Sequence, residues 1–340
     1  MQATIFGVEG TTLSRAERDF FRDCEPFGFI LFKRNCVSAD QLRALTDQLQ
    51  DCLGRKVPIL IDQEGGRVQR LAPPVWLARP APAQFGHVYH RDPEAGCRAA
   101  FLNAMIMAQE LTGLGIHVNC VPDLDLGHAD GHPAVIGDRV YGDTPTTVTA
   151  LGRAVSDGMM AGGVLPVIKH IPGHGRATLD THFDLPRIDA SLAVLQATDF
   201  LPFRALADLP MAMTGHLVMT AIDGENPATT SAKLIAEIIR GWMGFDGLLM
   251  SDDLSMQALK GSLRERCVDS LAAGCDIALH CNGDMAEMIS VAGGAGILSE
   301  AADRRAAAVI RALDRVANPA CDLAAAAAEL TKILAIRGLL

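Results

Sequence analysis

An aspartate and a histidine two residues apart, Asp180 and His182, are the first candidates for catalytic chemistry in this sequence. In an extended segment, side chains at positions i and i+2 lie on the same side of the backbone, so these two can hydrogen-bond. A carboxylate partner fixes the imidazole tautomer and favours its protonated form, which prepares a histidine for acid–base work near neutral pH. The alternative is an exposed pair without function, and the surrounding loop favours catalysis over it.

That loop lies between residues 164 and 186, in the segment VLPVIKHIPGHGRATLDTHFDLP. An apolar run ends at Lys169 and His170, and glycines and prolines follow within a few residues. The pattern predicts a strand that ends in a long loop, and such loops in compact domains usually bind or cover a ligand. For His174, inside PGHG, a packing role is the favoured interpretation.

A second reacting group is expected at Asp252, just after the apolar run Gly247–Met250. An aspartate at the end of a buried strand points into the mouth of a pocket, where it can act as a nucleophile or an electrostatic anchor. The next residue, Asp253, precedes a helix-like segment and can equally serve as a helix N-cap.

Other charged groups of both signs stand close to the ends of apolar runs or in nearby loops. They are Asp62, Arg67, Arg70, Arg139, Lys169 and His170. Sugar hydroxyls both donate and accept hydrogen bonds, so a saccharide pocket needs donors and acceptors together rather than a patch of one sign. The collection therefore predicts a sugar-binding pocket.

Metal ligation is the competing chemistry, with Asp123, Asp125, His128, Asp130 and His132 as candidate ligands. These residues lie on a glycine-containing loop, lack a His-x-x-x-His helical pair and do not close an obvious set of ligands. We expect neither a metal nor another cofactor.

The elements that must position these groups alternate between strand and helix. The apolar runs are Ala3–Val8, Gly28–Phe32, Val57–Ile61, Ile116–Val121, Val164–Ile168, Met211–Thr214, Gly247–Met250 and Asp276–Leu279. The main helical segments are Ser38–Cys52, Glu94–Leu114, Pro145–Met160, Ser231–Met243 and Ser255–Ala273. Runs with little alternation are typical of parallel strands buried on both faces.

Eight strand–helix units predict a (β/α)8 barrel of the TIM type, in which the polar strand ends meet at one rim. An open doubly wound sheet is the alternative, but the sequence has no GxGxxG loop. We expect one catalytic domain over residues 1–340, with about 299–340 forming C-terminal helices packed on the barrel.

Composition excludes several classes of partner. The net charge is −10 and no Lys/Arg run occurs, which argues against nucleic acid. The nine cysteines are scattered without a CxxC pair, as expected of reduced thiols. The start MQATIFGVEG lacks the pattern of a signal peptide, and no apolar stretch reaches the roughly twenty residues of a membrane span. We expect a cytoplasmic monomer that binds a small saccharide or muropeptide and no membrane.

The motifs resemble those of a known family. KHIPGHG followed by Asp180-Thr181-His182 is similar to the signature of bacterial family 3 glycoside hydrolases of the β-N-acetylglucosaminidase type. The similarity extends over FGVEG, LFKRN, DQEGGRVQR, GDRVYG, GFDGLLMSDDLSM and AGCDIAL. This chain has Ile171 where the family usually has Phe, and Thr181 where it has Ser.

The resemblance implies a retaining hydrolase with Asp252 as nucleophile, His182 as acid/base and Asp180 as the partner of His182. It assigns the binding of N-acetylglucosamine to Asp62, Arg70, Arg139, Lys169 and His170. The implied task is removal of N-acetylglucosamine from GlcNAc-1,6-anhydroMurNAc and its peptides, in the peptidoglycan recycling that serves cell-wall biogenesis and cell division. A phosphorylase or a β-glucosidase on the same barrel is the alternative; a non-catalytic sugar-binding barrel would be expected to lack Asp252 or His182.

Overall fold

The computed structural model describes residues 1–132, 136–179, 185–316 and 322–336. The predicted pair Asp180 and His182 lies outside these ranges. The central sheet consists of β1 (Gln2–Gly7), β2 (Pro26–Leu31), β3 (Ile59–Ile61), β4 (Val118–Asn119), β5 (Leu165–Pro166), β6 (Ile168–Ile171), β8 (Met211–Thr214), β10 (Leu248–Asp253) and β11 (Ile277–His280). Each of the eight predicted apolar runs contributes to this sheet.

The strands form a nearly closed parallel barrel in the order β5-β4-β3-β2-β1-β11-β10-β8-β6. Its ends meet in one continuous stretch of chain, because β5 pairs with β4 while β6, one residue further on, pairs with β8. A parallel bridge between Asp123 and Lys169 adds a contact at this junction. The predicted TIM-type barrel is therefore confirmed.

Side chains alternate between the barrel interior and the outer layer of helices. In β3, Leu60 belongs to the cluster that fills the interior, whereas Ile59 and Ile61 belong to the cluster beneath the helices. Ile5 and Phe6 in β1 divide in the same way. Because both faces are buried, apolar residues occupy both sets of positions, and this explains the unalternating runs of the sequence.

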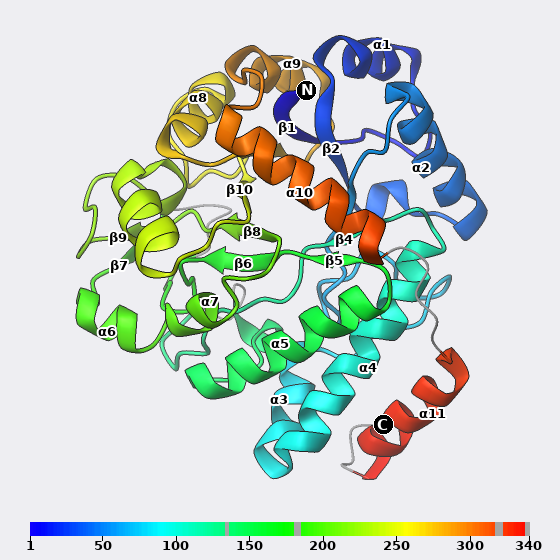
Figure 1. Ribbon diagram of the computed structural model, residues 1–340, viewed down its shortest axis with the longest axis vertical. Coiled ribbons are helices and arrows are strands. Elements are labelled where there is room, and N and C mark those ends of the chain that lie inside the picture. The colour runs from blue at the N-terminus through cyan, green and yellow to red at the C-terminus, as the bar shows by residue number, and fades with distance from the viewer. Residues whose placement is uncertain (133–135, 180–184, 317–321, 337–340) are drawn as a thin grey trace.

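Helices surround the barrel (Figure 1). They are α1 (Arg15–Cys24), α2 (Ala39–Leu53), α3 (Pro82–Arg91), α4 (Pro93–Thr112), α5 (Pro145–Ala161), α6 (Leu192–Ala197), α7 (Leu201–Ala205), the π-helical η4 (Leu234–Trp242), α8 (Leu263–Ala273) and α9 (Met285–Gly294). Short 3-10 turns are η1 (Lys33–Asn35), η2 (Gly137–Arg139) and η3 (Ala228–Thr230), and β7 (Arg187–Ile188) pairs with β9 (Val218–Met219) in a small second sheet. None of the described helices is long and apolar enough to cross a membrane.

The predicted helix Ser255–Ala273 was wrong in its first half. The residues after β10 form turns, and α8 begins only at Leu263, where Ser262 accepts a hydrogen bond from the backbone of Glu265. Just before this cap, Gly261 has a φ of +82°, which a continuing helix does not allow. Asp253 consequently caps a turn and not a helix, because its carboxylate accepts a hydrogen bond from the backbone of Ser255.

The C-terminal helices occupy two different places. Helix α10 (Glu300–Val316) crosses the barrel, and its apolar side joins the interior cluster through Ala302, Ala306, Val309, Ala312 and Leu313. Helix α11 (Leu323–Ile336) packs against α4 on the outside, where Arg98 and Glu329 form an ion pair of 2.7 Å. Thus α10 covers the amino-terminal end of the barrel, opposite the rim of polar strand ends.

Replacing Leu313 by Ala tests this role of α10. Leu313 is only 3% exposed, so its truncation should leave a cavity and lower the free energy of unfolding by about 2–4 kcal/mol. Denaturant titration measures this loss, and Ile297→Ala is the matched control because Ile297 is 83% exposed. Equal stability of the two variants would show that α10 is not part of the core.

Candidate active site

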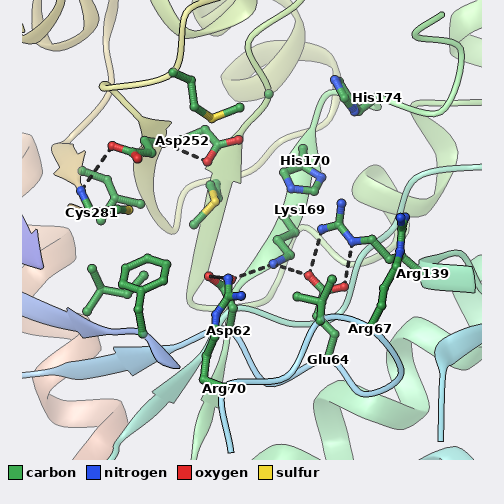
Figure 2. Close-up of a pocket in the computed structure, with 18 residues that line it drawn as sticks. Asp62, Glu64, Arg67, Arg70, Arg139, Lys169, His170, His174, Asp252 and Cys281 are labelled. Carbon is green, nitrogen blue, oxygen red and sulfur yellow. Dashed lines mark hydrogen bonds and ion pairs between the residues drawn. The ribbon is translucent and has the colours of Figure 1, made fainter. Parts of the chain in front are cut away.

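A cavity of about 350 Å³ opens at the carboxyl ends of the barrel strands. Its wall includes residues from several strands and the loops that follow them, as Figure 2 shows. They include Phe32, Asp62, Glu64, Arg67, Arg70, Arg139, Lys169, His170, His174, Met213, Asp252, Asp253, Met256 and Cys281. All five predicted binding residues and Asp252 therefore lie around one cavity. Asp62 and Asp252 are 190 positions apart in the chain.

The ammonium group of Lys169 lies at the centre of a network of buried charges. Its Nζ is 2.9 Å from Asp62 Oδ1 and 2.7 Å from Glu64 Oε1. Arg139 donates to both oxygens of Glu64, at 2.9 and 2.8 Å, and Arg70 Nη2 lies 3.1 Å from Asp62 Oδ2. Charges this deeply buried are tolerated only when each is paired in this way.

The network fixes the charges of its carboxylates. Burial alone would raise the pKa of Asp62, but Lys169 and Arg70 lower it well below the ordinary value. Burial would also raise the pKa of Glu64, but the adjacent Arg139 and Lys169 lower it below the ordinary value. Asp62 thus stays ionised at any physiological pH and presents a fixed acceptor to the pocket.

Glu64 is the member of this network that the sequence prediction missed. It is almost completely buried and anchors Arg139 and Lys169 together. The signal was its position two residues after Asp62 in DQEGG, on the same strand-end loop. Nothing in the sequence indicated that two distant cations would converge on it.

Two predicted arginines have different surroundings. The guanidinium of Arg70 lies over the Phe32 ring, 5.1 Å from its centroid, and is thereby held beside Asp62. Arg67 instead pairs with Asp138 at 3.0 Å, and its side chain is more exposed. Arg70 is therefore a fixed donor in the pocket wall, whereas Arg67 joins the Gly137–Arg139 turn to the rim.

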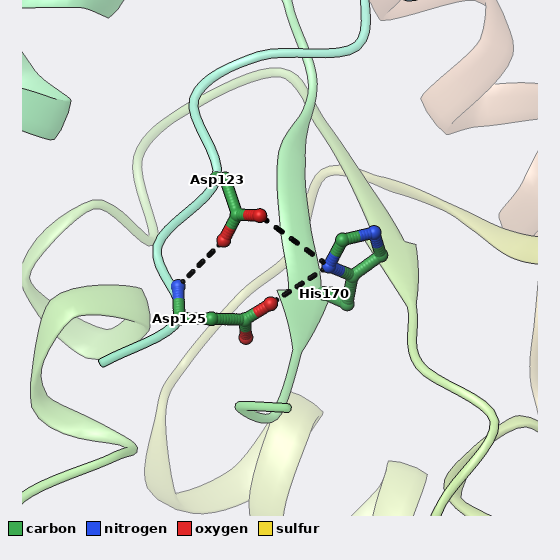
Figure 3. Close-up of side chains that lie close together, drawn as sticks. All are labelled: Asp123, Asp125 and His170. Atoms are coloured by element: carbon green, nitrogen blue, oxygen red, sulfur yellow. Dashed lines mark hydrogen bonds and ion pairs between the residues drawn. The ribbon is translucent and has the colours of Figure 1, made fainter. Parts of the chain in front are cut away.

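Asp123, Asp125 and His170 form a compact cluster behind the pocket (Figure 3). His170 Nδ1 lies 2.8 Å from Asp125 Oδ2, and Asp125 Oδ1 accepts a 2.6 Å hydrogen bond from the backbone of His174. Asp123 Oδ1 in turn accepts from the backbone of Asp125. The cluster therefore orients the His170 imidazole and anchors the start of the PGHG loop, which continues toward Asp180.

The same cluster is the one group of three among the described residues whose donor atoms, all within 4.8 Å of one another, could hold a metal ion. Asp123 and Asp125 were among the candidate metal ligands in the sequence, whereas His128, another candidate, is not part of this cluster. His128 lies elsewhere, 3.1 Å from Asp199. Since the three groups already hydrogen-bond to one another or to the backbone, we assign them a supporting role.

Asp252 and Asp253 are the last residues of β10 and are partly exposed to the cavity. The backbone amide of Asp253 donates to Asp252 Oδ1 at 2.8 Å. The carboxylate of Asp253 accepts from the hydroxyl of Ser255 and the amide of Cys281. Asp252 thus keeps an oxygen available at the pocket wall, facing the Lys169 network across the cavity in Figure 2.

A pocket of mixed charge at the carboxyl rim of a (β/α)8 barrel defines an enzyme that acts on a small polar molecule. Residues 8–317 match the family described as the glycosyl hydrolase family 3 N-terminal domain. The chain belongs to this family and is a glycoside hydrolase, as its motifs predicted.

Individual relatives agree with this assignment. The chain is 41% identical over 282 residues to a β-hexosaminidase of Alkalilimnicola ehrlichii, covering 82% of this chain and 80% of that protein. A β-hexosaminidase of Xylella fastidiosa is 39% identical over 285 residues, covering 83% and 84%. The crystal structure of NagZ from Neisseria gonorrhoeae in complex with N-trifluoroacetyl-D-glucosamine superposes with a TM-score of 0.86 at 31% identity, covering 97% of each chain. The predicted place in the β-N-acetylhexosaminidase group is confirmed.

Asp123→Asn tests the charge balance of the cluster. Burial, followed by the adjacent Asp125 carboxylate, raises the pKa of Asp123 to about 8. The folded protein therefore keeps a proton that the unfolded chain releases above about pH 4, so this group lowers stability as pH rises from about 4 to 8. Between pH 5 and pH 8 the melting temperature of Asp123→Asn should fall less than that of the wild type, by about 2 °C or more.

Thermal unfolding at the two pH values measures this difference. The control is Asp51→Asn, which changes an exposed aspartate of α2. A parallel decline in the wild type and Asp123→Asn would show that Asp123 is ionised throughout this range.

Proposed function

We propose that this chain is a retaining exo-β-N-acetylglucosaminidase that removes terminal N-acetylglucosamine from peptidoglycan fragments. The observation that carries the proposal is the pocket itself, which places Asp252 opposite a fixed set of donors and acceptors centred on Lys169. The N-trifluoroacetyl-D-glucosamine bound in the N. gonorrhoeae NagZ structure supports an N-acylated glucosamine as the ligand.

The charged network suits the hydroxyl groups of one sugar ring. Asp62 supplies an ionised acceptor, while Lys169, Arg70 and Arg139 supply donors whose positions are fixed by their ion pairs. Hydrogen bonds to charged groups are stronger than neutral ones, and rigid partners lose little entropy on binding. His170, held by Asp125, completes the proposed binding set.

The reaction proceeds in two steps at the anomeric carbon. Asp252 attacks this carbon and forms a glycosyl ester while the glycosidic bond breaks, and His182 gives its proton to the leaving oxygen. A water then loses a proton to His182 and displaces Asp252, which releases the sugar with retained configuration. Asp180 holds the imidazole in the required tautomer during both transfers.

The loop that carries this acid/base follows directly from β6. Lys169 and His170 lie within β6, and the backbone of His174 is tied to Asp125, so the loop starts from a rigid base. A histidine in this role departs from the two-carboxylate pattern of most retaining glycosidases.

The proposed substrates are GlcNAc-1,6-anhydroMurNAc and its peptides, and the proposed setting is cytoplasmic cell-wall recycling by a monomer. The family motifs support this choice. We expect both the disaccharide and the muropeptide to be turned over.

A turnover assay tests the substrate. An aryl β-N-acetylglucosaminide should be hydrolysed at least about a hundredfold faster than the aryl β-glucoside, because a site built to bind an amide leaves polar groups unpaired without it. Comparable rates would contradict the acetamido assignment. The same assay with added phosphate should yield only free N-acetylglucosamine, and a sugar phosphate product would instead establish a phosphorylase.

One variant and one labelling experiment test the catalytic roles. His182→Ala should lose roughly a hundredfold or more in kcat on a substrate with a poor leaving group and much less on an activated aryl glycoside, because only the first needs a proton. A slow fluorosugar should label Asp252, as mass spectrometry of peptides will show. Equal losses on both substrates, or a label on Asp253, would overturn these assignments.

A further inference from the structure

His280 is a buried titratable group that the proposed reaction does not use. It is the last residue of β11, has no exposed surface, and precedes Cys281, which lines the pocket. Neither ring nitrogen has a hydrogen-bond partner among the described residues. Buried polar groups without partners are rare in folded proteins and call for a specific explanation.

The imidazole lies between two carboxylates from different elements. Nδ1 is 3.9 Å from Asp253 Oδ1, at the end of β10, and Nε2 is 3.5 Å from Glu287 Oε2, in the first turn of α9. Neither pair has the geometry of a hydrogen bond, but a small movement of either carboxylate would make one.

Asp253 connects this histidine to the proposed nucleophile. Its backbone amide donates to Asp252 Oδ1, and its carboxylate is held by Ser255 and by the amide of Cys281. His216, two residues after β8, contacts the carbonyl oxygen of Asp253, with 3.0 Å between its Nε2 and that oxygen. The carboxylate that faces His280 therefore belongs to the same residue whose backbone amide orients Asp252.

We propose that His280 is a positioning residue for the nucleophile, which acts through Asp253 and takes Glu287 as its second partner. The inference rests on the proposed role of Asp252. In this role the buried imidazole affects the reaction without touching the sugar.

The contacts that His280 can make depend on the number of protons on its ring. A neutral imidazole has one N–H and faces two acceptors, so it can donate to Asp253 or to Glu287 but not to both. An imidazolium can donate to both, which would draw the Asp253 carboxylate away from Ser255 and Cys281. A neutral ring whose N–H is directed at Asp253 supports this carboxylate where Ser255 and Cys281 hold it, and Asp252 then faces the pocket.

The charges around the ring come from several elements. Burial lowers the pKa of His280, while Asp253 of β10, Glu287 of α9, the nearby Asn282 side chain and Asp284, the N-cap of α9, oppose this effect. Two arginines lie near the same carboxylates: Arg266 of α8 faces Asp253 and Glu287, and Arg34 faces Asp253. The amide of Asn282 donates to Glu287.

Substitution of His280 separates positioning from mere packing. On an aryl N-acetylglucosaminide, His280→Leu should lower kcat about tenfold and change KM by less than about twofold, because it affects only the reacting geometry. His280→Gln keeps a neutral donor and should recover part of the lost kcat. His117→Leu is the control, since His117 is a largely buried histidine at the other end of the barrel, just before β4.

Glu287→Gln provides a second measurement that does not depend on a core substitution, because the Glu287 side chain is 41% exposed. Removing this charge lowers the pKa of His280 further, so the acid limb of kcat/KM should move to lower pH by about half a unit. An unmoved acid limb, or a His280→Leu variant with the kcat of the control, would overturn the inference. If the wild type itself does not hydrolyse the aryl glycoside, the proposed function fails instead.

Discussion

The ion pair between Lys169 and the carboxylates of Asp62 and Glu64 is the interaction on which the site depends. An ammonium group with only 3% of its side chain exposed is stable only because two anions lie within 2.9 Å of it. The same contacts fix both carboxylates in their ionised form and orient Arg70 and Arg139 through them. Lys169 links the Asp62–Arg70 pair to the Glu64–Arg139 pair, so its removal would leave each carboxylate with one cation instead of two.

Barrel closure is what brings these charges together. The stretch from β5 to β6 pairs with β4 through one half and with β8 through the other, and Lys169 lies in the second half. Lys169 therefore extends across the rim to Asp62 and Glu64, which follow β3. The apolar interior and α10 fill the opposite end, and the charged cavity lies at the rim that carries the chemistry.

Much of the fold could be predicted from the sequence because parallel strands buried on both faces leave unalternating apolar runs. Glycine also marks two helix ends, because Gly54 and Gly274 cap α2 and α8 with a positive φ that carries no steric penalty for glycine. The start of α8 had a local signal of another kind, the capping box of Ser262 and Glu265 just after Gly261, which the periodicity alone does not reveal. Helical periodicity continues through the turns after β10, and only the backbone at Gly261 and the Ser262 cap decide where the helix begins.

The sequence by itself determined the residue types and their local order: a carboxylate at the end of one strand, Lys169 and His170 in another, and an Asp-x-His pair beyond them. Such information is local, because it depends on neighbours along the chain. Only the tertiary structure decided that Glu64 joins Lys169 to Arg139, and that Asp253 lies between Asp252 and a buried His280. Those relations depend on distances between strands, which are set by barrel closure and packing and leave no mark on sequence spacing.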